Sequence, residues 1–123
     1  MVTTYVLDTS VLLANPKSIF SFENHQVVLP LIVLKELESK RNDPELGHLA
    51  RQALRSLEEL RNTKGDLKTG VVVTPEGGVL RVEVSPGDRS LLPESIRNDY
   101  SHDTIIISVA ASLSKGDSKV VLV

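Results

Sequence analysis

TYVLDTSVLLA, residues 4–14, is the stretch that decides the fold class of this chain. Its first four residues are β-prone and apolar and predict a strand, while residues 11–14 predict a short helix that Pro16 ends. Asp8 lies in the turn between them, followed by a Thr and a Ser. A strand that leads directly into a helix is the repeating unit of α/β folds, and ligands bind at the carboxyl ends of such strands. Asp8 is therefore a candidate site residue.

Strands and helices continue to alternate along the next part of the chain. Residues 26–29 are continuously apolar, as in a strand buried on both faces of a parallel sheet, and residues 31–40 predict an amphipathic helix. A second, longer amphipathic helix is predicted to begin at residues 43–45, where Asp, Pro and Glu follow one another, and to end near Asn62. This order indicates βαβ units with right-handed crossovers.

The second half of the chain predicts a hairpin, a loop, a helix and a last strand. Residues 71–74 and 79–84 predict a small antiparallel hairpin insertion, and residues 86–100 a long exposed loop. A helix follows and is expected to end before Gly116, and residues 119–123 begin another buried strand. The expected fold class is α/β, with a central parallel sheet between helices in three layers, α/β/α.

Composition limits the kind of protein that this chain can be. Its 123 residues, 41% of them hydrophobic, suffice for one domain. It has no cysteine, no secretory signal and no apolar run of membrane-spanning length, so we expect the cytoplasm and no membrane partner. The formal net charge of -2 argues against nucleic-acid binding through bulk electrostatics, and any contact with RNA must be local.

Three acids occupy positions that could converge: Asp8 after the first strand, Glu36 in the helix after the second, and Asp103 at the start of the last helix. Each also has an ordinary explanation, since Asp8 and Asp103 could cap helices and Glu36 could lie on a solvated face. Clustered carboxylates repel one another unless a cation neutralises them, and sites with only oxygen ligands suit Mg²⁺ or Mn²⁺. A metal held there could activate water for phosphodiester hydrolysis.

Three segments carry a family resemblance: LDTSVLL at 7–13, VLPLIVLKELESKR at 28–41 and DTIIISVA at 103–110. They resemble the signature segments of PIN-domain ribonucleases. With PELGHLARQALRSLEELR at 44–61 and the hairpin before the third acid, the similarity is closer still to the PIN domain that precedes a PhoH-like ATPase domain. The resemblance spans essentially the whole chain.

This resemblance implies a PIN domain over residues 1–123 that acts as a Mg²⁺- or Mn²⁺-dependent endoribonuclease on single-stranded RNA. The implied catalytic and metal-binding residues are Asp8, Glu36 and Asp103. Further candidates are Thr9 or Ser10 as supports of the first acid, Asp99 as an outer ligand, and Lys40 and Arg41 as RNA contacts.

The end of the chain leads us to expect a C-terminally truncated domain. Residues 120–123 are an apolar run that would lead straight into a loop at the ligand edge of the sheet. PIN domains usually carry a further acid just past this strand, and the resemblance places a PhoH-like ATPase domain beyond it. We therefore expect a site that is one carboxylate short, and the fragment alone to be weakly active or inactive.

Two other functions stay open at this point. The chain could be a non-catalytic module that binds RNA or mediates homo-oligomer assembly for the ATPase, or a free-standing toxin ribonuclease controlled by an antitoxin. Other chemistry finds less support, because His25, His48 and His102 are not paired for zinc or acid-base catalysis. No Lys-Ser/Thr pair follows a glycine-rich turn, as nucleotide triphosphate binding would require.

Overall fold

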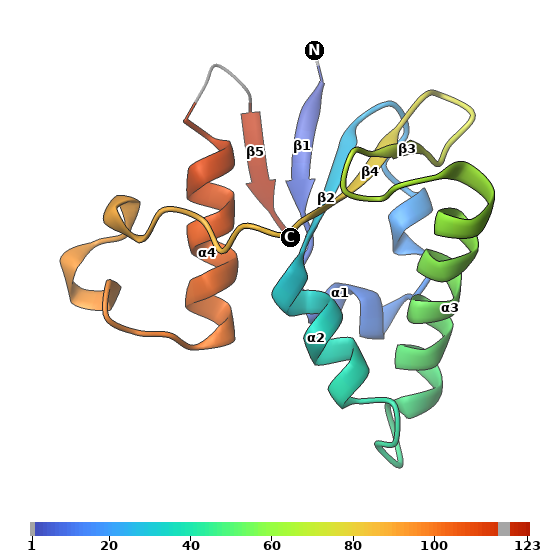
Figure 1. The fold of residues 1–123 in the computed structure, drawn as a ribbon, viewed down its shortest axis with the longest axis horizontal. Coiled ribbons are helices and arrows are strands. Elements are labelled where there is room, and N and C mark those ends of the chain that lie inside the picture. The colour runs from blue at the N-terminus through green and yellow to red at the C-terminus, as the bar shows by residue number, and fades with distance from the viewer. Residues whose placement is uncertain (1, 116–118) are drawn as a thin grey trace.

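One five-stranded sheet organises the fold, and its strand order is β3-β4-β2-β1-β5 (Figure 1). The computed structural model describes residues 2–115 and 119–123. The parallel strands are β1 (Thr3–Val6), β2 (Gln26–Pro30), β4 (Val79–Glu83) and β5 (Lys119–Leu122), and β3 (Val71–Val72) runs antiparallel to β4. Because β1 lies between β2 and β5, the carboxyl ends of these three strands meet at one edge.

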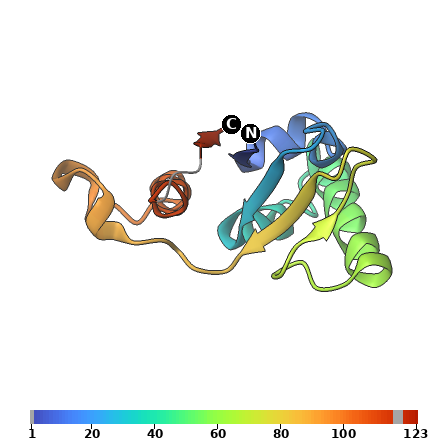
Figure 2. The same cartoon turned by 90° about the horizontal axis from the view of Figure 1, so that it is seen from above.

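Helices cover both faces of this sheet. The α-helices are α1 (Thr9–Ala14), α2 (Leu31–Ser39), α3 (Gly47–Lys64) and α4 (His102–Leu113), and the 3-10 turns are η1 (Ser18–Phe20), η2 (Arg89–Leu91) and η3 (Glu94–Ile96). Seen along the strands, α3 lies on one side of the sheet and α4 on the other (Figure 2). The predicted three-layer α/β/α architecture is thus confirmed. Within the described residues, no helix is long and apolar enough to cross a membrane.

The core forms where the buried strand faces meet the helices. All of β2 after its first residue is buried, which confirms the prediction from its continuous apolar run. In α2 Val33 and Leu37 are buried and Leu34 packs partly buried against the core, so this helix presents an apolar stripe to the sheet as predicted. The fully buried large side chains include Leu7, Leu12, Ile19, Val27, Val28, Leu29, Val33, Leu37, Leu80 and Val109.

The predicted hairpin forms, and its second arm, β4, also joins the main sheet, which the sequence did not predict. β4 also pairs in parallel with β2, from Gln26 beside Val79 to Pro30 beside Glu83, so it is a full member of the main sheet. The turn is tied to the loop before β2: a Cβ at Gly78 would overlap the carbonyl oxygen of Glu23. Only glycine permits this close approach.

The predicted start of α3 was wrong by a few residues. The Asp43 carboxylate accepts hydrogen bonds from the backbone N–H groups of Glu45 and Leu46, each at 2.9 Å, and so closes a separate turn. The helix begins only at Gly47 and runs to Lys64, where Gly65 with φ 118° ends it. The signal at residues 43–45 was a real capping motif for a turn that precedes the helix.

The loop from 86 to 100 is mostly exposed, as predicted, although it contains η2 and η3 and buries Leu92. The helix after it, α4, ends at Leu113. The expected helix end before Gly116 rests on a residue that lies outside the described residues.

Candidate acidic site at the carboxyl edge of the sheet

Asp8 lies at the carboxyl end of β1 and caps α1. Its Oδ1 accepts a 2.6 Å hydrogen bond from the Thr9 backbone N–H, and its Oδ2 accepts one of 3.2 Å from the Ser10 hydroxyl. Its own backbone N–H donates to the carbonyl of Val123 at 3.1 Å. The carboxylate is therefore held in a fixed position at the edge where β1 and β5 end.

Asp103 and Asp8 line the same cavity, which has a volume of about 250 Å³. Asp103 lies in the first turn of α4, where the positive end of the helix dipole favours a negative charge. The rest of the cavity wall is apolar and consists of Ile106, Ile107, Leu122 and Val123. Within residues 2–115 and 119–123, neither carboxylate makes an ion pair with a basic side chain. Two carboxylates thus share one apolar-walled cavity without a countercharge from the described residues.

Glu36 is linked to the neighbours of both aspartates. The Thr9 hydroxyl donates a 3.0 Å hydrogen bond to its Oε1, and His102 Nδ1 lies 3.5 Å from its Oε2. The Glu36 side chain is only 23% exposed, and Thr9 is buried. The sequence had suggested Thr9 only as a support for Asp8 and had not placed His102 in the site. Their contacts with Glu36 depend on how α1, α2 and α4 pack together, which no local sequence pattern specifies.

The three acids do not form one ligand cluster. Over the part of the chain that the structure describes, no three acidic, histidine or cysteine side chains lie close enough together to hold a metal ion. The pair of Asp8 and Asp103 fits a hard divalent cation, because both offer carboxylate oxygens to one cavity. Glu36 instead contacts Thr9 and His102, so its place is beside that cavity.

Asp99 is engaged in shaping the start of α4. Its carboxylate accepts a 2.9 Å hydrogen bond from the Ser101 backbone N–H and a 3.0 Å bond from the Thr104 hydroxyl. The first of these bonds, with help from the second, lowers the pKa of Asp99 below its usual value. Asp99 does not line the cavity of Asp8 and Asp103.

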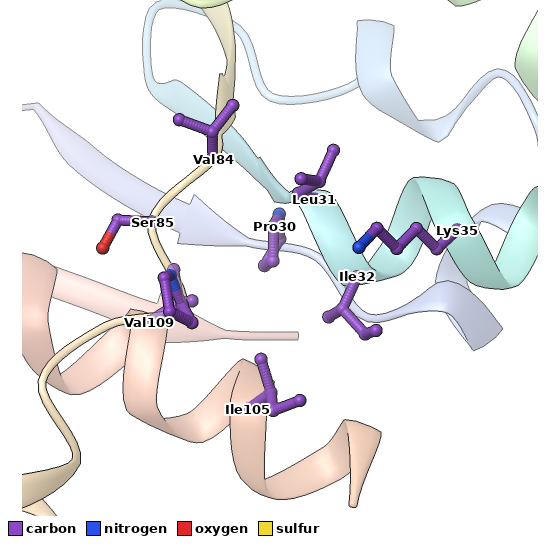
Figure 3. Close-up of a pocket in the computed structure, with 9 residues that line it drawn as sticks. Pro30, Leu31, Ile32, Lys35, Val84, Ser85, Ile105 and Val109 are labelled. Atoms are coloured by element: carbon purple, nitrogen blue, oxygen red, sulfur yellow. The ribbon is translucent and has the colours of Figure 1, made fainter. Parts of the chain in front are cut away.

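The basic candidates lie away from that cavity. Arg41 pairs with Glu38 at 2.6 Å and lines a different hollow, between α2 and α3, and Lys40 is the C-cap of α2. Lys35 lines a third, apolar cavity between α2 and α4 (Figure 3). The walls of that cavity include Pro30, Ile32, Ile105 and Val109 and contain no acid. The basic residues on the helix faces therefore did not mark the position of the acidic cavity.

The fold and the acidic edge define the class of protein. A family model described as "PIN domain" matches residues 5–123, and this chain therefore belongs to the PIN domain family. Membership supports a nuclease-type domain, and PIN domains generally use divalent metals. No solved structure matches the chain.

Several curated relatives have the same printed name, Protein PhoH2. The chain is 49% identical over 122 residues to that of Mycolicibacterium smegmatis and 47% identical over 120 residues to that of Thermobispora bispora. It is 42% identical over 111 residues to that of Bacillus subtilis. The matches cover 99%, 98% and 89% of this chain but only 28%, 27% and 24% of the respective relatives, so the chain spans about a quarter of their length.

Proposed function

We propose that this domain is a divalent-metal-dependent endoribonuclease that hydrolyses single-stranded RNA. The observation that carries the proposal is the cavity shared by Asp8 and Asp103 at the carboxyl edge of the sheet, where neither acid has a basic partner among the described residues. Two unneutralised carboxylates in one apolar-walled cavity are the arrangement that a cation stabilises. Nuclease chemistry then agrees with the family to which the chain belongs.

Each acid has a separate role in this proposal. Asp8 and Asp103 would hold a Mg²⁺ or Mn²⁺ ion, which when bound supplies Lewis-acid activation of water and of the scissile phosphate. Thr9 and Ser10 hold the Asp8 carboxylate in place, since the Thr9 N–H and the Ser10 hydroxyl both donate to it. The Thr9 hydroxyl positions Glu36 by donating to its Oε1, and the other carboxylate oxygen of Glu36 faces His102; in this proposal Glu36 would assist from beside the cavity.

A further ligand has a natural place beside Asp8. The carbonyl of Val123 accepts from the Asp8 N–H, and the Val123 N–H donates to the carbonyl of Val6 at 2.9 Å. An acid in a segment directly after Val123 would therefore lie beside Asp8 in space. This geometry supports the expectation that a complete site contains one more carboxylate than this chain provides.

In a longer protein we propose that this domain precedes a PhoH-like ATPase domain that remodels RNA. The support is that the relatives named Protein PhoH2 are about four times as long as the matched region. The same observation favours a fused protein over a free-standing toxin with an antitoxin. Homo-oligomer assembly is part of this proposal, because it would bring several such domains to one RNA.

A second candidate function is a non-catalytic module that binds RNA or assists assembly. One observation favours it: each acid already has a structural task, since Asp8 caps α1, Asp103 lies in the first turn of α4 and Glu36 accepts from Thr9. In that case substitution of the acids would alter stability and leave any RNA cleavage unchanged.

Cleavage of a labelled single-stranded RNA separates the two candidates. The chain, and a longer protein that contains it, are incubated with Mn²⁺, with Mg²⁺ or with EDTA, and Asp8→Asn is compared with Asp66→Asn. Asp66 is an exposed turn residue that accepts from the Lys68 N–H and lies outside the cavity, so it is a matched control. We expect metal-dependent cleavage by the longer protein, which Asp8→Asn abolishes and Asp66→Asn retains, and little or no cleavage by the chain alone. Equal, metal-dependent cleavage by both variants of the longer protein would overturn the catalytic assignment.

A further inference from the structure

The most exposed aromatic side chain lies in the segment that leads into the acidic site. Aromatic residues are scarce in this chain, with only two Tyr and two Phe. Tyr100 is 68% exposed, the highest value among the large apolar side chains that are exposed. Tyr joins an apolar ring to a polar hydroxyl, so an exposed tyrosine can offer its ring face to a ligand while the hydroxyl stays in water.

Arg89 holds this ring in place from one side. Its guanidinium carbon lies 4.0 Å from the centroid of the Tyr100 ring, a cation-π contact. The same guanidinium donates to the carbonyl oxygens of Arg97, at 2.6 and 3.0 Å, and of Asp99. Arg89 therefore ties the two ends of the exposed loop together and is fixed where it covers one face of the ring. Because Arg89 lies over the ring and Tyr100 is still 68% exposed, we take the opposite face of the ring to be open to a ligand.

Tyr100 is also close to the acids along the chain. It precedes Ser101, the N-cap of α4, and it lies three residues before Asp103. Three successive Cα–Cα steps of 3.8 Å limit the separation of the Tyr100 and Asp103 Cα atoms to about 11 Å. His102, between them, contacts Glu36 at 3.5 Å. Tyr100 therefore belongs to the segment that enters the candidate site, within reach of a nucleotide next to one bound there.

We propose that the open face of Tyr100 stacks on a base of the single-stranded RNA, next to the nucleotide whose phosphate enters the acidic cavity. This inference rests on the proposed function and names the part of the substrate that the site recognises. Every base has an apolar π face, so an aromatic platform binds single strands with little sequence preference. Such a contact suits a chain of net charge -2, which lacks bulk electrostatic attraction to RNA.

Binding of a short single-stranded RNA without cleavage tests the proposal. Affinity is measured in EDTA by fluorescence anisotropy for the full chain and for Tyr100→Ala, Tyr100→Trp and Phe20→Ala. Phe20 is the matched control, because it is 37% exposed and carries Lys17 Nζ at 5.8 Å from its ring, yet lies in η1. We expect about tenfold weaker binding by Tyr100→Ala, as loss of one stacked base predicts. Tyr100→Trp and Phe20→Ala should bind as the unaltered chain does.

An RNA with abasic positions identifies the base as the partner. The loss caused by Tyr100→Ala should vanish on a fully abasic strand of the same length, because no base remains to stack. A loss of the same size on abasic RNA, or no loss on ordinary RNA, would overturn the proposal. Failure of this proposal can be told apart from failure of the nuclease assignment. The nuclease assignment is tested by RNA cleavage with Asp8→Asn, whereas the binding assay in EDTA measures no cleavage.

Discussion

Replacement of Thr9 by Val tests the link between α1 and Glu36. Val keeps the branched shape of the buried side chain and removes only the hydroxyl that donates to Glu36 Oε1 at 3.0 Å. A hydrogen bond to a charged group contributes about 1.5–3 kcal/mol when it is well shielded. The Glu36 side chain is 23% exposed, so water replaces part of the lost bond. We therefore expect the free energy of unfolding to fall by about 1–2 kcal/mol.

Urea denaturation of a double-mutant cycle measures this contribution directly. The cycle combines Thr9→Val with Glu36→Ala, and the pair in contact should show a coupling energy of about 1 kcal/mol. Thr9→Ser is the control, since it keeps the hydroxyl and loses only a methyl group. If Thr9→Val and Glu36→Ala lower stability additively, the hydrogen bond contributes nothing and the assignment of Thr9 as a positioning residue for Glu36 is refuted.

Two further predictions concern the loop before α4 and the hairpin. Bonds from the Ser101 N–H and the Thr104 hydroxyl lower the pKa of Asp99, so its stabilising effect is present above its unfolded pKa near 3.8 and is lost as pH falls through the lower folded value. Asp99→Asn should therefore lower the melting temperature at pH 7 and have a progressively smaller effect as pH falls below 3.8, and an effect that does not change with pH would contradict this origin. Gly78→Ala should destabilise the protein by about 1–3 kcal/mol in urea denaturation, because its Cβ would overlap the Glu23 carbonyl oxygen. Gly77→Ala is the comparison at the same turn, where φ of 90° causes strain but no atom lies within 4 Å, and a smaller loss there would support the steric account.

The repeating elements of the fold could be predicted from the sequence because each is a local pattern. The continuous apolar run of β2 and the periodic spacing of α3 depend on burial of one face or both, and the structure has both elements. The start of α3 could not be placed, since Asp43 caps a turn with the same residue type that caps a helix. The pairing of β4 with β2 was also missed, because a hairpin signal describes only the nearer partner of a strand.

The candidate site shows the same division between local and tertiary information. The position of Asp8 followed from one strand and one turn, and the structure does place it at the carboxyl edge of the sheet. The contacts of Glu36 with Thr9 and His102 come from three different helices, so no spacing rule could reveal them. Lys40 and Arg41 remain predictions for RNA contact, although Arg41 pairs with Glu38 and faces another hollow.

Binding of Mn²⁺ by the chain tests the central claim most directly, namely that Asp8 and Asp103 form one cation site. Electron paramagnetic resonance counts free and bound Mn²⁺ for the unaltered chain, for Asp8→Asn, for Asp103→Asn and for the control Asp66→Asn. We predict one weakly bound ion per chain, at least tenfold weaker binding after either cavity substitution, a loss of about 1.4 kcal/mol, and no change for the control. Unchanged Mn²⁺ binding by Asp8→Asn and Asp103→Asn would contradict the account.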